Sequence, residues 1–463
     1  MVSFILPGNS ASGEYEVANS LRFNDDSSDY LSITPGSSSN TKKWTFSCWI
    51  KLGNIKNSFH SIFTAFTGST DQYNAVALDN SNRVVFITMD EGSGGVMNVI
   101  SNAMLRDPSA WYHIVTAYDS AQATDTNRVK GYINGTQVTS LSTSNYPAQD
   151  KTTYINSNNQ HNIGKRWNAN YYDGYMAEVV FIDGQALTPT SFGEFDSDTN
   201  IWKPIDVSGL TFGTNGFYLD FEDSSALGDD VSGNNNDFTV NNLTSVDQST
   251  DTCTNNFATM NPLDKTPIGT SLTYSHGNLV ITASSGSDWT TRYSLSNFVV
   301  SSGKWYVECQ VGSIGTNQWY VGVIKNRQTA TFNSSLGFLS NGVGYGHYAA
   351  DGRIINNGSD LSTGSSFTTN DIIGIALDLD NGTLNFYKNG SANGSQVTSL
   401  DTTAEWQFVS NSYSNAAWNW NFGGTQSFTI SSGNSDGNGI GNFEYSVPSG
   451  YFALCTSNLA EHG

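Results

Sequence analysis

We predict an all-β protein made of two antiparallel β-sandwiches that are joined by an acidic connector. Short runs in which apolar and polar residues alternate recur along the chain, and clusters of Gly, Asn, Asp and Ser separate them, which is the pattern of strands and turns. Of the 463 residues, 45 are Gly, 13% are aromatic and 13% are charged, a composition unlike that of helical or disordered chains. Helical periodicity is almost absent.

In the first half of the chain, the clearest strand is predicted at residues 44–51. Its alternation places Trp49 on one face and Trp44, Phe46, Cys48 and Ile50 on the other, so both faces carry large side chains, as a sandwich requires. Further strands are predicted at 83–87, 111–118 and 129–133. The last of them runs into Asn134 and Gly135, a pair that favours a hairpin turn.

The second half repeats this pattern. Strands are predicted at 304–311, 319–323, 372–379 and 384–388, and the last ends in another Asn-Gly turn at Asn389 and Gly390.

Four parts follow from these elements. Between the two halves, the chain is dense in Asp and Asn and has one clear strand at 216–221, and Pro262 and Pro267 mark a boundary near residue 264. We therefore expect an N-terminal docking segment at 1–18, a first sandwich at 19–202, an acidic connector with some strand at 203–264, and a second sandwich at 265–463.

Charge and apolar content exclude several partners. With 41 Asp and Glu against 20 Lys and Arg, the formal net charge is -21, so we expect no nucleic-acid partner, because phosphate binding needs clustered Lys and Arg. No apolar run reaches the ~18 residues that membrane insertion needs, and we expect no signal peptide. The cysteines Cys48, Cys253, Cys309 and Cys455 form no C-x-x-C pair, so buried free thiols are expected.

The catalytic residues of known hydrolases are not found, and we predict no enzyme activity. The nearest approach to the carboxylate pair of a sandwich glycosidase is Glu194 with Asp196, and its spacing departs from the Glu-x-Asp-x-x-Glu strand of those enzymes. The histidines show no metal-ligand spacing. His113, beside Trp111 in a predicted strand, is interpreted as a hydrogen-bonded sandwich residue rather than a base.

Calcium is the one cofactor that the sequence suggests. Hard oxygen ligands are clustered at Asp25, Asp26 and Asp29, and a second acidic cluster runs from Asp220 to Asp237. Neither cluster has the spacing of a known calcium loop, so solvated acidic loops are the alternative.

Aromatic residues in polar loops are the candidate ligand-binding residues, because sugar rings stack on Trp and Tyr faces while amides bind hydroxyl groups. Packing inside a sandwich would explain any one of them equally well. The first choice is the loop before residue 174, and two stretches of the second half are similar. The candidates are Trp167, Asn168, Asn170, Tyr171, Tyr172, Tyr345, His347, Tyr348, Trp418 and Trp420.

The first block resembles the laminin-G-like (concanavalin A-like) jelly-roll family. Residues 44–51 are similar to its "F-T-x-x-x-W-I-K" strand, 111–115 to its "W-x-H-V" strand, 130–135 to its "x-Y-x-N-G" hairpin and 172–179 to its "F-D-G-x-I-D-E-V" segment. The resemblance implies a concanavalin-like sandwich, and the rim calcium frequent in that family adds weight to the first acidic cluster.

The second block resembles the SPRY family. Residues 303–308 are similar to "G-K-W-Y-F-E", 371–378 to "D-V-I-G-V-A-L-D", 382–390 to "G-T-L-x-F-x-K-N-G" and 450–455 to "G-F-x-A-L-C". The resemblance implies a recognition module that binds through loops at one end of the sandwich.

Together the two blocks look like bacteriophage virion proteins, which implies a non-enzymatic tail-fibre or capsid-attached fibre component in a virion released by lysis. The expected partners are other virion subunits and a host surface glycan or protein, and a homo-oligomer, with a trimer favoured, is expected. A polysaccharide depolymerase and a purely architectural decoration protein are the alternatives.

Overall fold

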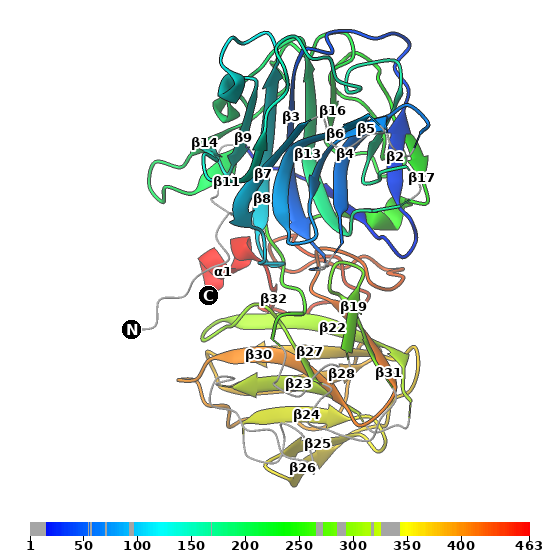
Figure 1. Ribbon diagram of the computed structural model, residues 1–463. Coiled ribbons are helices and arrows are strands. Elements are labelled where there is room, and N and C mark those ends of the chain that lie inside the picture. The colour runs from blue at the N-terminus through cyan, green and yellow to red at the C-terminus, as the bar shows by residue number, and fades with distance from the viewer. Residues whose placement is uncertain are drawn as a thin grey trace. The chain divides into compact units, whose positions relative to one another are not determined.

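The computed structural model describes residues 15–53, 55, 58–69, 72–91, 97–167, 169–264, 272–284, 293–315, 319–325 and 343–463. The chain divides into two compact units, Met1–Asn255 and Asn256–Gly463. Each unit is a sandwich of antiparallel sheets (Figure 1), so the predicted all-β fold is confirmed.

The first unit consists of two facing sheets, here called sheets A and B (Figure 1). In sheet A the order is β10 (Thr136–Gln137), β9 (Val129–Ile133), β8 (Trp111–Asp119), β3 (Lys43–Leu52), β13 (Gly174–Asp183), β1 (Ser20–Phe23) and β18 (Gln248–Ser249), and β16 (Phe217–Leu219) also pairs with β13. In sheet B the order is β11 (Leu141–Asn145), β7 (Met97–Met104), β6 (Arg83–Glu91), β5 (Gln72–Leu78), β4 (His60–Phe66), β12 (Gln160–Ile163), β2 (Tyr30–Ile33) and β17 (Thr239–Asn241). A separate hairpin joins β14 (Gly193–Phe195) to β15 (Trp202–Pro204), and short 3-10 turns lie at Asp125–Asn127, Pro189–Ser191 and Ser245–Asp247.

The alternation predicted for residues 44–51 is confirmed in β3. Trp44, Phe46, Cys48 and Ile50 lie in the core between the sheets, and Trp49 lies on the outer face of sheet A. The turn at Asn134 and Gly135 has φ of 46° and 75° and connects β9 to β10, as predicted. The thiol of Cys48 is buried and free, as are those of the other three cysteines.

The outer face of sheet A is apolar as well and is covered by chain that lies outside the central strands. One cluster on it contains Val115, Val180 and Tyr218 under Phe192, Val207 and Phe212. A second contains Trp49, Trp111 and Tyr175 under Val17, Trp202 and Cys253. Residues between 187 and 254 therefore complete the first sandwich.

The predicted connector, 203–264, is thus not a separate part of the chain. Residues up to 255 belong to the first unit, to which they contribute β16, β17 and β18. The boundary lies nearer to residue 255 than to 264. The apolar side chains of this segment pack on sheet A, and this packing makes the segment part of the first unit although its composition is acidic. Residues 1–14 of the predicted docking segment lie outside the described residues, whereas Tyr15 and Val17 pack on sheet A.

The second unit is also a pair of sheets, here called sheets C and D (Figure 1). In sheet C the order is β19 (Leu272–Ser275), β20 (Val280–Ala283), β31 (Ala416–Asn421), β22 (Lys304–Ser313), β27 (Ile372–Asp378), β28 (Thr383–Lys388) and β29 (Ser391–Ala392), with β32 (Phe452–Ala453) parallel to β22. In sheet D the order is β21 (Tyr293–Leu295), β30 (Trp406–Ser412), β23 (Trp319–Lys325), β24 (Gly344–Tyr348), β25 (Arg353–Asn356) and β26 (Ser359–Thr363). The helix α1 (Thr456–His462) ends the chain.

A buried carboxylate attaches the N-terminal segment to sheet A. Glu178 lies at a bulge of β13 with φ of 51°, a conformation that costs a non-glycine residue roughly 1–2 kcal/mol. The hydroxyl of Tyr218 lies 3.0 Å from each of its carboxylate oxygens, and the hydroxyl of Tyr15 donates to Oε2 at 3.0 Å. Burial raises the pKa of Glu178 to about 7, although both tyrosine hydroxyls oppose this shift.

Stability should therefore depend on the protonation of Glu178. Because its pKa is higher in the folded than in the unfolded chain, the contribution is fully present below about pH 4.5 and is lost as pH rises through about 7. We expect Glu178→Gln, which cannot ionise, to flatten the dependence of the unfolding free energy on pH. At pH 8 it should be more stable than the wild type, by on the order of 3 kcal/mol. Urea unfolding at pH 5 and pH 8 measures this, with Glu461→Gln, whose side chain is 64% exposed, as control. Equal pH slopes for the wild type and Glu178→Gln would contradict it.

A second test concerns how residues 203–255, which the sequence analysis assigned to a connector, are attached to the first unit. Arg22 of β1 pairs with Asp247 at 2.5 Å, with 5% and 9% of their side chains exposed. We expect Asp247→Ala to destabilise the first unit by about 3–5 kcal/mol, because it leaves a buried guanidinium without its carboxylate. The exposed pair of Lys42 with Asp150, at 3.1 Å, provides the control, and Asp150→Ala should cost less than about 1 kcal/mol. Equal, small losses in urea unfolding would show that residues 245–247 do not support the sandwich.

Candidate functional site

The outer face of sheet B carries a row of cross-strand neighbours. Phe66 of β4 pairs with Tyr73 of β5, which pairs with Asp90 of β6. Ala65 directly precedes Phe66 and Met89 directly precedes Asp90, and both of these side chains point into the core. The row therefore lies on the outer face, and Phe66 and Asp90 are partly exposed there.

The loop between β12 and β13 lies against this row. Arg166 and Ala169 exchange backbone hydrogen bonds of 3.2 and 3.0 Å, which close a tight turn. Trp167 has φ of 35° and Asn170 φ of 56°, in a region that is strained for a side chain as bulky as that of Trp. The side chain of Trp167 is directed toward Tyr73, and the ring centroids are 5.5 Å apart in an edge-to-face arrangement.

Arg166 is surrounded by aromatic rings. Its Cζ lies 4.6, 4.7 and 4.3 Å from the ring centroids of Phe59, Tyr73 and Trp167. Nη1 donates to the hydroxyl of Tyr73 at 3.0 Å, and the carboxamide oxygen of Asn170 accepts from Nε and Nη2 at 3.2 and 2.8 Å. Burial lowers the pKa of Arg166, but a guanidinium stays charged. The cation is thus fixed in place by stacking and hydrogen bonds.

Lys165 makes a similar arrangement on the other side of the loop. Its Nζ lies 3.7 Å from the ring centroid of Tyr30 and 5.6 Å from that of Tyr171. A hydrogen bond holds this part of the loop on the sheet, because the side-chain hydroxyl of Thr64 in β4 donates to the backbone carbonyl of Lys165 at 2.7 Å. We call these side chains the cation–aromatic surface: Tyr30, Phe59, Tyr73, Lys165, Arg166, Trp167, Asn170 and Tyr171.

Three of the predicted loop residues, Trp167, Asn170 and Tyr171, belong to this surface and are partly exposed. Asn168 lies outside the described residues. Tyr172 is different, because it is fully buried and its hydroxyl donates to the carbonyl of Lys51 at 3.0 Å. The prediction of a ligand contact at Tyr172 is therefore corrected, since it begins the alternation that carries β13 into the core.

In the second unit, most of the predicted contact residues lie in the core. Trp418 and Trp420 are fully buried between the sheets. Tyr345 packs on Trp406, and His347 lies between Phe367 and Phe386. Strand alternation places these side chains inward and corrects their prediction as surface contacts.

Tyr348 follows on the opposite face of β24. Its ring stacks on that of Tyr320 at 4.6 Å, and Cζ of Arg353 lies 5.4 Å from its centroid. Of the predicted residues in this unit, Tyr348 is the one on an outer face, but it is buried there in an apolar cluster, with 9% of the residue exposed.

The aspartates predicted to bind calcium organise a turn. Asp29 is 1% exposed and its Oδ2 accepts from the backbone N–H of Asn24 at 2.9 Å, while the carbonyl of Asp25 accepts from Ser28 at 3.2 Å. Burial raises the pKa of Asp29. Within the described ranges, no group of three or more His, Cys, Asp or Glu side chains could hold a metal ion. Calcium binding at Asp25, Asp26 and Asp29 thus has no support from this arrangement and stays a prediction.

Other acidic residues also have structural partners. The carboxylate of Asp230 accepts from the backbone N–H groups of Tyr218, Ser232 and Asn236 at 2.8 to 3.0 Å and closes a loop of the second acidic cluster. Lys203 lies 3.4 Å from Glu194 and 3.3 Å from Asp196 across the β14–β15 hairpin. A cation between the two carboxylates favours an ion-pair network over a catalytic pair.

His113 is hydrogen-bonded, as predicted. Nε1 of Trp202 donates to its Nδ1 at 2.9 Å, which leaves Nε2 as the donor to the hydroxyl of Ser47 at 2.8 Å. Burial lowers the pKa of His113 to about 3, so the ring is neutral.

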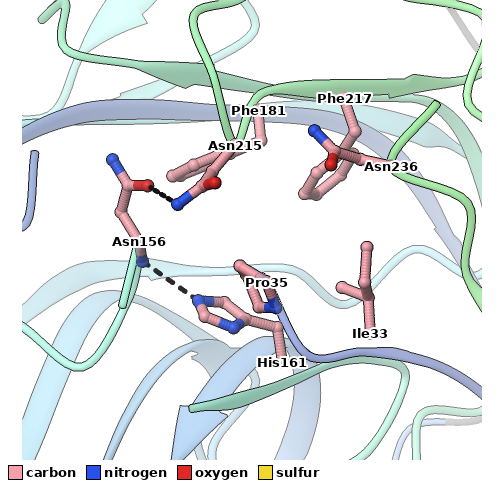
Figure 2. A pocket seen from close by; sticks show the side chains of 8 residues that line it. All are labelled: Ile33, Pro35, Asn156, His161, Phe181, Asn215, Phe217 and Asn236. Carbon is pink, nitrogen blue, oxygen red and sulfur yellow. Dashed lines mark hydrogen bonds between the residues drawn. The ribbon is translucent and has the colours of Figure 1, made fainter. Parts of the chain in front are cut away.

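The first unit contains a small cavity lined by three side-chain amides, by His161 and by four apolar side chains (Figure 2). Figure 2 shows the amides of Asn156 and Asn215 facing each other, with the Asn215 Nδ2 donating to the Asn156 Oδ1 at 2.9 Å, and the ring of His161 directed at the backbone of Asn156. The free volume of about 10 Å³ is what one water molecule needs. The amide nitrogens of Asn156, Asn215 and Asn236 also donate to backbone carbonyls of Asn40, Ser37 and Thr214, so the cavity is structural.

Sequence reasoning missed the cations and the sheet residues of the cation–aromatic surface. Lys165 and Arg166 directly precede Trp167, and a basic pair beside an aromatic residue in a chain of net charge -21 was a usable signal. Tyr30, Phe59 and Tyr73 lie far from this loop in sequence, and only the pairing of β2, β12, β4 and β5 brings them to it.

In the part of the chain that the structure describes, no helix has the length and apolar character to cross a membrane.

Comparisons with known proteins match a family model to part of each unit. Residues 25–191 match the Laminin_G_3 model, described as the concanavalin A-like lectin/glucanases superfamily, and residues 304–425 match the SPRY domain model. Among curated proteins no match is found.

Several solved structures are similar to parts of the chain. The SPRY domain of human HERC1 is 23% identical with a TM-score of 0.30, and the match covers 35% of this chain and 96% of that one. The PSpry domain of TRIM65 is 14% identical with a TM-score of 0.30, covering 35% and 89%. A SAP-like pentraxin from Limulus polyphemus is 12% identical with a TM-score of 0.28, covering 38% and 80%. By the two family matches, the chain carries a concanavalin A-like domain of the Laminin_G_3 family followed by a SPRY domain.

Proposed function

We propose that the protein is a non-enzymatic recognition component of a bacteriophage virion, a tail-fibre or capsid-attached fibre protein, and that it binds a host surface glycan through the cation–aromatic surface. The virion context rests on the resemblance of the domain combination. Its location on the particle, its association with other virion subunits and a trimeric state stay predictions.

The observation that supports glycan binding is the partly exposed ring of Trp167 beside a fixed guanidinium. Aromatic faces bind the apolar face of a sugar, and Arg and Asn side chains bind hydroxyl or acid groups. Because Arg166 is already oriented by Tyr73 and Asn170, little side-chain entropy is lost when a ligand binds. The strained backbone of Trp167 is consistent with a conformation kept for binding.

Glycan recognition also fits the surroundings of this surface. The row of Phe66, Tyr73 and Asp90 extends it along sheet B, which gives a chain of several sugars room to lie across the strands. The ion pairs of Glu194 and Asp196 with Lys203 favour binding over hydrolysis.

Binding should depend on Trp167. We expect Trp167→Ala to weaken binding to the polysaccharide of a susceptible host by about tenfold or more, as central aromatic contacts do, with the melting temperature nearly unchanged because the ring is partly exposed. Binding is measured on immobilised polysaccharide and by adsorption to cells.

The control in the second unit is Tyr348→Ala, which removes a buried ring that is 9% exposed and packs on Tyr320 on the outer face of sheet D, so binding is compared only where the melting temperature shows that the variant is folded. If Tyr348→Ala abolishes binding and Trp167→Ala does not, the binding surface is on the second unit. If the wild type binds host cells only after their glycan has been removed, the ligand is a surface protein and the glycan proposal fails.

A further inference from the structure

A cavity of about 180 Å³ opens on the outer face of sheet A, at its β8–β9 edge. Lys130 and Tyr132 of β9 line it, opposite Ala117 of β8, with which Lys130 is in register. Val129 of the same strand points into the core, so Lys130 and Tyr132 both point outward. The cavity is smaller than the roughly 300–1,000 Å³ of ordinary ligand pockets, which suits a single sugar-sized ring.

The walls of the cavity are held in place before any ligand binds. On one side, the hydroxyl of Thr45 donates to the carbonyl of Gln185 at 2.8 Å and accepts from the N–H of Leu187 at 2.8 Å, which fixes residues 185–187 on the sheet. On the other side, Arg128 donates to the carbonyls of Gln122 and Ala123 at 2.9 and 2.8 Å. The loop that carries Gln122 and Asn127 is thereby fixed.

The charges in the cavity favour an anion. Asp119 is already neutralised, because Lys43 Nζ lies 3.0 Å from its Oδ2 and Gln122 donates to the same oxygen at 2.8 Å. Burial alone would raise the pKa of Asp119, but these hydrogen bonds outweigh it and lower the pKa. Lys130 makes no ion pair with any described residue, which leaves its positive charge uncompensated in a chain of net charge -21.

The remaining groups suit a hydroxylated ring. Tyr132 and Leu187 contribute apolar surface, and Asn127 and Thr188 also line the cavity, where the hydroxyl of Thr188 lies 2.9 Å from that of Thr190. Within the described residues, the side chain of Asn127 and the hydroxyl of Tyr132 have no hydrogen-bond partner, so their polar atoms are available. One cation, several neutral hydrogen-bonding groups and an apolar wall match a sugar that carries a carboxylate.

We propose that this cavity binds one acidic sugar residue, a uronate, with Lys130 at its carboxylate and Asn127 and Thr188 at its hydroxyl groups. This inference rests on the proposed glycan-binding function and deepens it, because it places a second contact on the same domain and states which class of glycan is preferred.

Titration calorimetry with sodium D-glucuronate, D-glucose and sodium acetate on the full-length protein tests the proposal. We expect glucuronate to bind at least about tenfold more tightly than glucose or acetate, because a hydrogen-bonded charge pair is lost with glucose and the ring contacts are lost with acetate. Lys130→Gln should remove this preference, and Lys130→Arg should keep it. Lys42→Gln, which removes a surface lysine outside the cavity, should bind as the wild type does.

The outcomes separate this inference from the proposed function. If glucuronate does not bind, or binds equally well to Lys130→Gln, while polysaccharide binding still depends on Trp167, the cavity proposal is overturned and the proposed function stands. If acetate binds as tightly as glucuronate, the cavity recognises a carboxylate alone and the sugar assignment is overturned. If glucuronate binding depends on Lys130 but no polysaccharide binding depends on Trp167, the cavity proposal stands and the cation–aromatic surface is not the glycan site.

Discussion

The need to cover a sheet that is apolar on both faces determines most of the first unit. In β3, β8 and β13 the inward positions fill the core between the sheets, while the outward positions carry Trp49, Trp111 and Tyr175. Burying a large aromatic side chain stabilises a fold by roughly 1.5–3 kcal/mol relative to leaving it in water. The outer face of sheet A therefore requires further chain to pack on it, and residues 187–254 with Tyr15 and Val17 supply that chain.

This covering layer explains why a polar, acidic segment belongs to the sandwich. Its few apolar residues, such as Trp202 and Phe212, lie on sheet A, and its aspartates pair with cations of the sheet. Lys51 of β3 pairs with Asp251 at 2.6 Å, with 1% of each side chain exposed. Such a pair adds little net stability, because desolvation offsets its attraction, but an alternative arrangement of the segment would leave a buried charge without its partner.

Both candidate ligand sites lie where a sheet face is left partly open. On sheet B, the loop before β13 lies against Tyr73, and among the described residues Trp167, Tyr171, Lys165 and Arg166 remain partly exposed there. On sheet A, the covering layer leaves a cavity between residues 186–188 and the loop before β9. In each place a rigid sheet supports a loop fixed by its own hydrogen bonds, which is the usual way in which a sandwich presents a binding surface.

The sequence by itself determined the class of fold, the position of the main strands and which side of β3 faces the core, because the period of alternation in a strand is local and needs no knowledge of its neighbours. The two Asn-Gly turns could be predicted equally well from the sequence, because Asn and Gly adopt positive φ more easily than other residues. Only the tertiary structure decided which aromatic residues are accessible. Trp167 and Trp418 look alike in sequence, but one lies at the apex of a turn and the other points between two sheets.

The tertiary structure alone also decided the extent of the first unit and the composition of its binding surfaces. β16 pairs with β13, and β17 and β18 pair with β2 and β1, which lie more than a hundred residues away in sequence. This pairing joins the acidic segment to the sandwich, and composition does not report it. For the same reason, Arg166 meets Phe59 and Tyr73 only because β4, β5 and β12 are neighbours in one sheet. Local patterns specify strands, whereas the contacts between strands that are distant in sequence specify the sites.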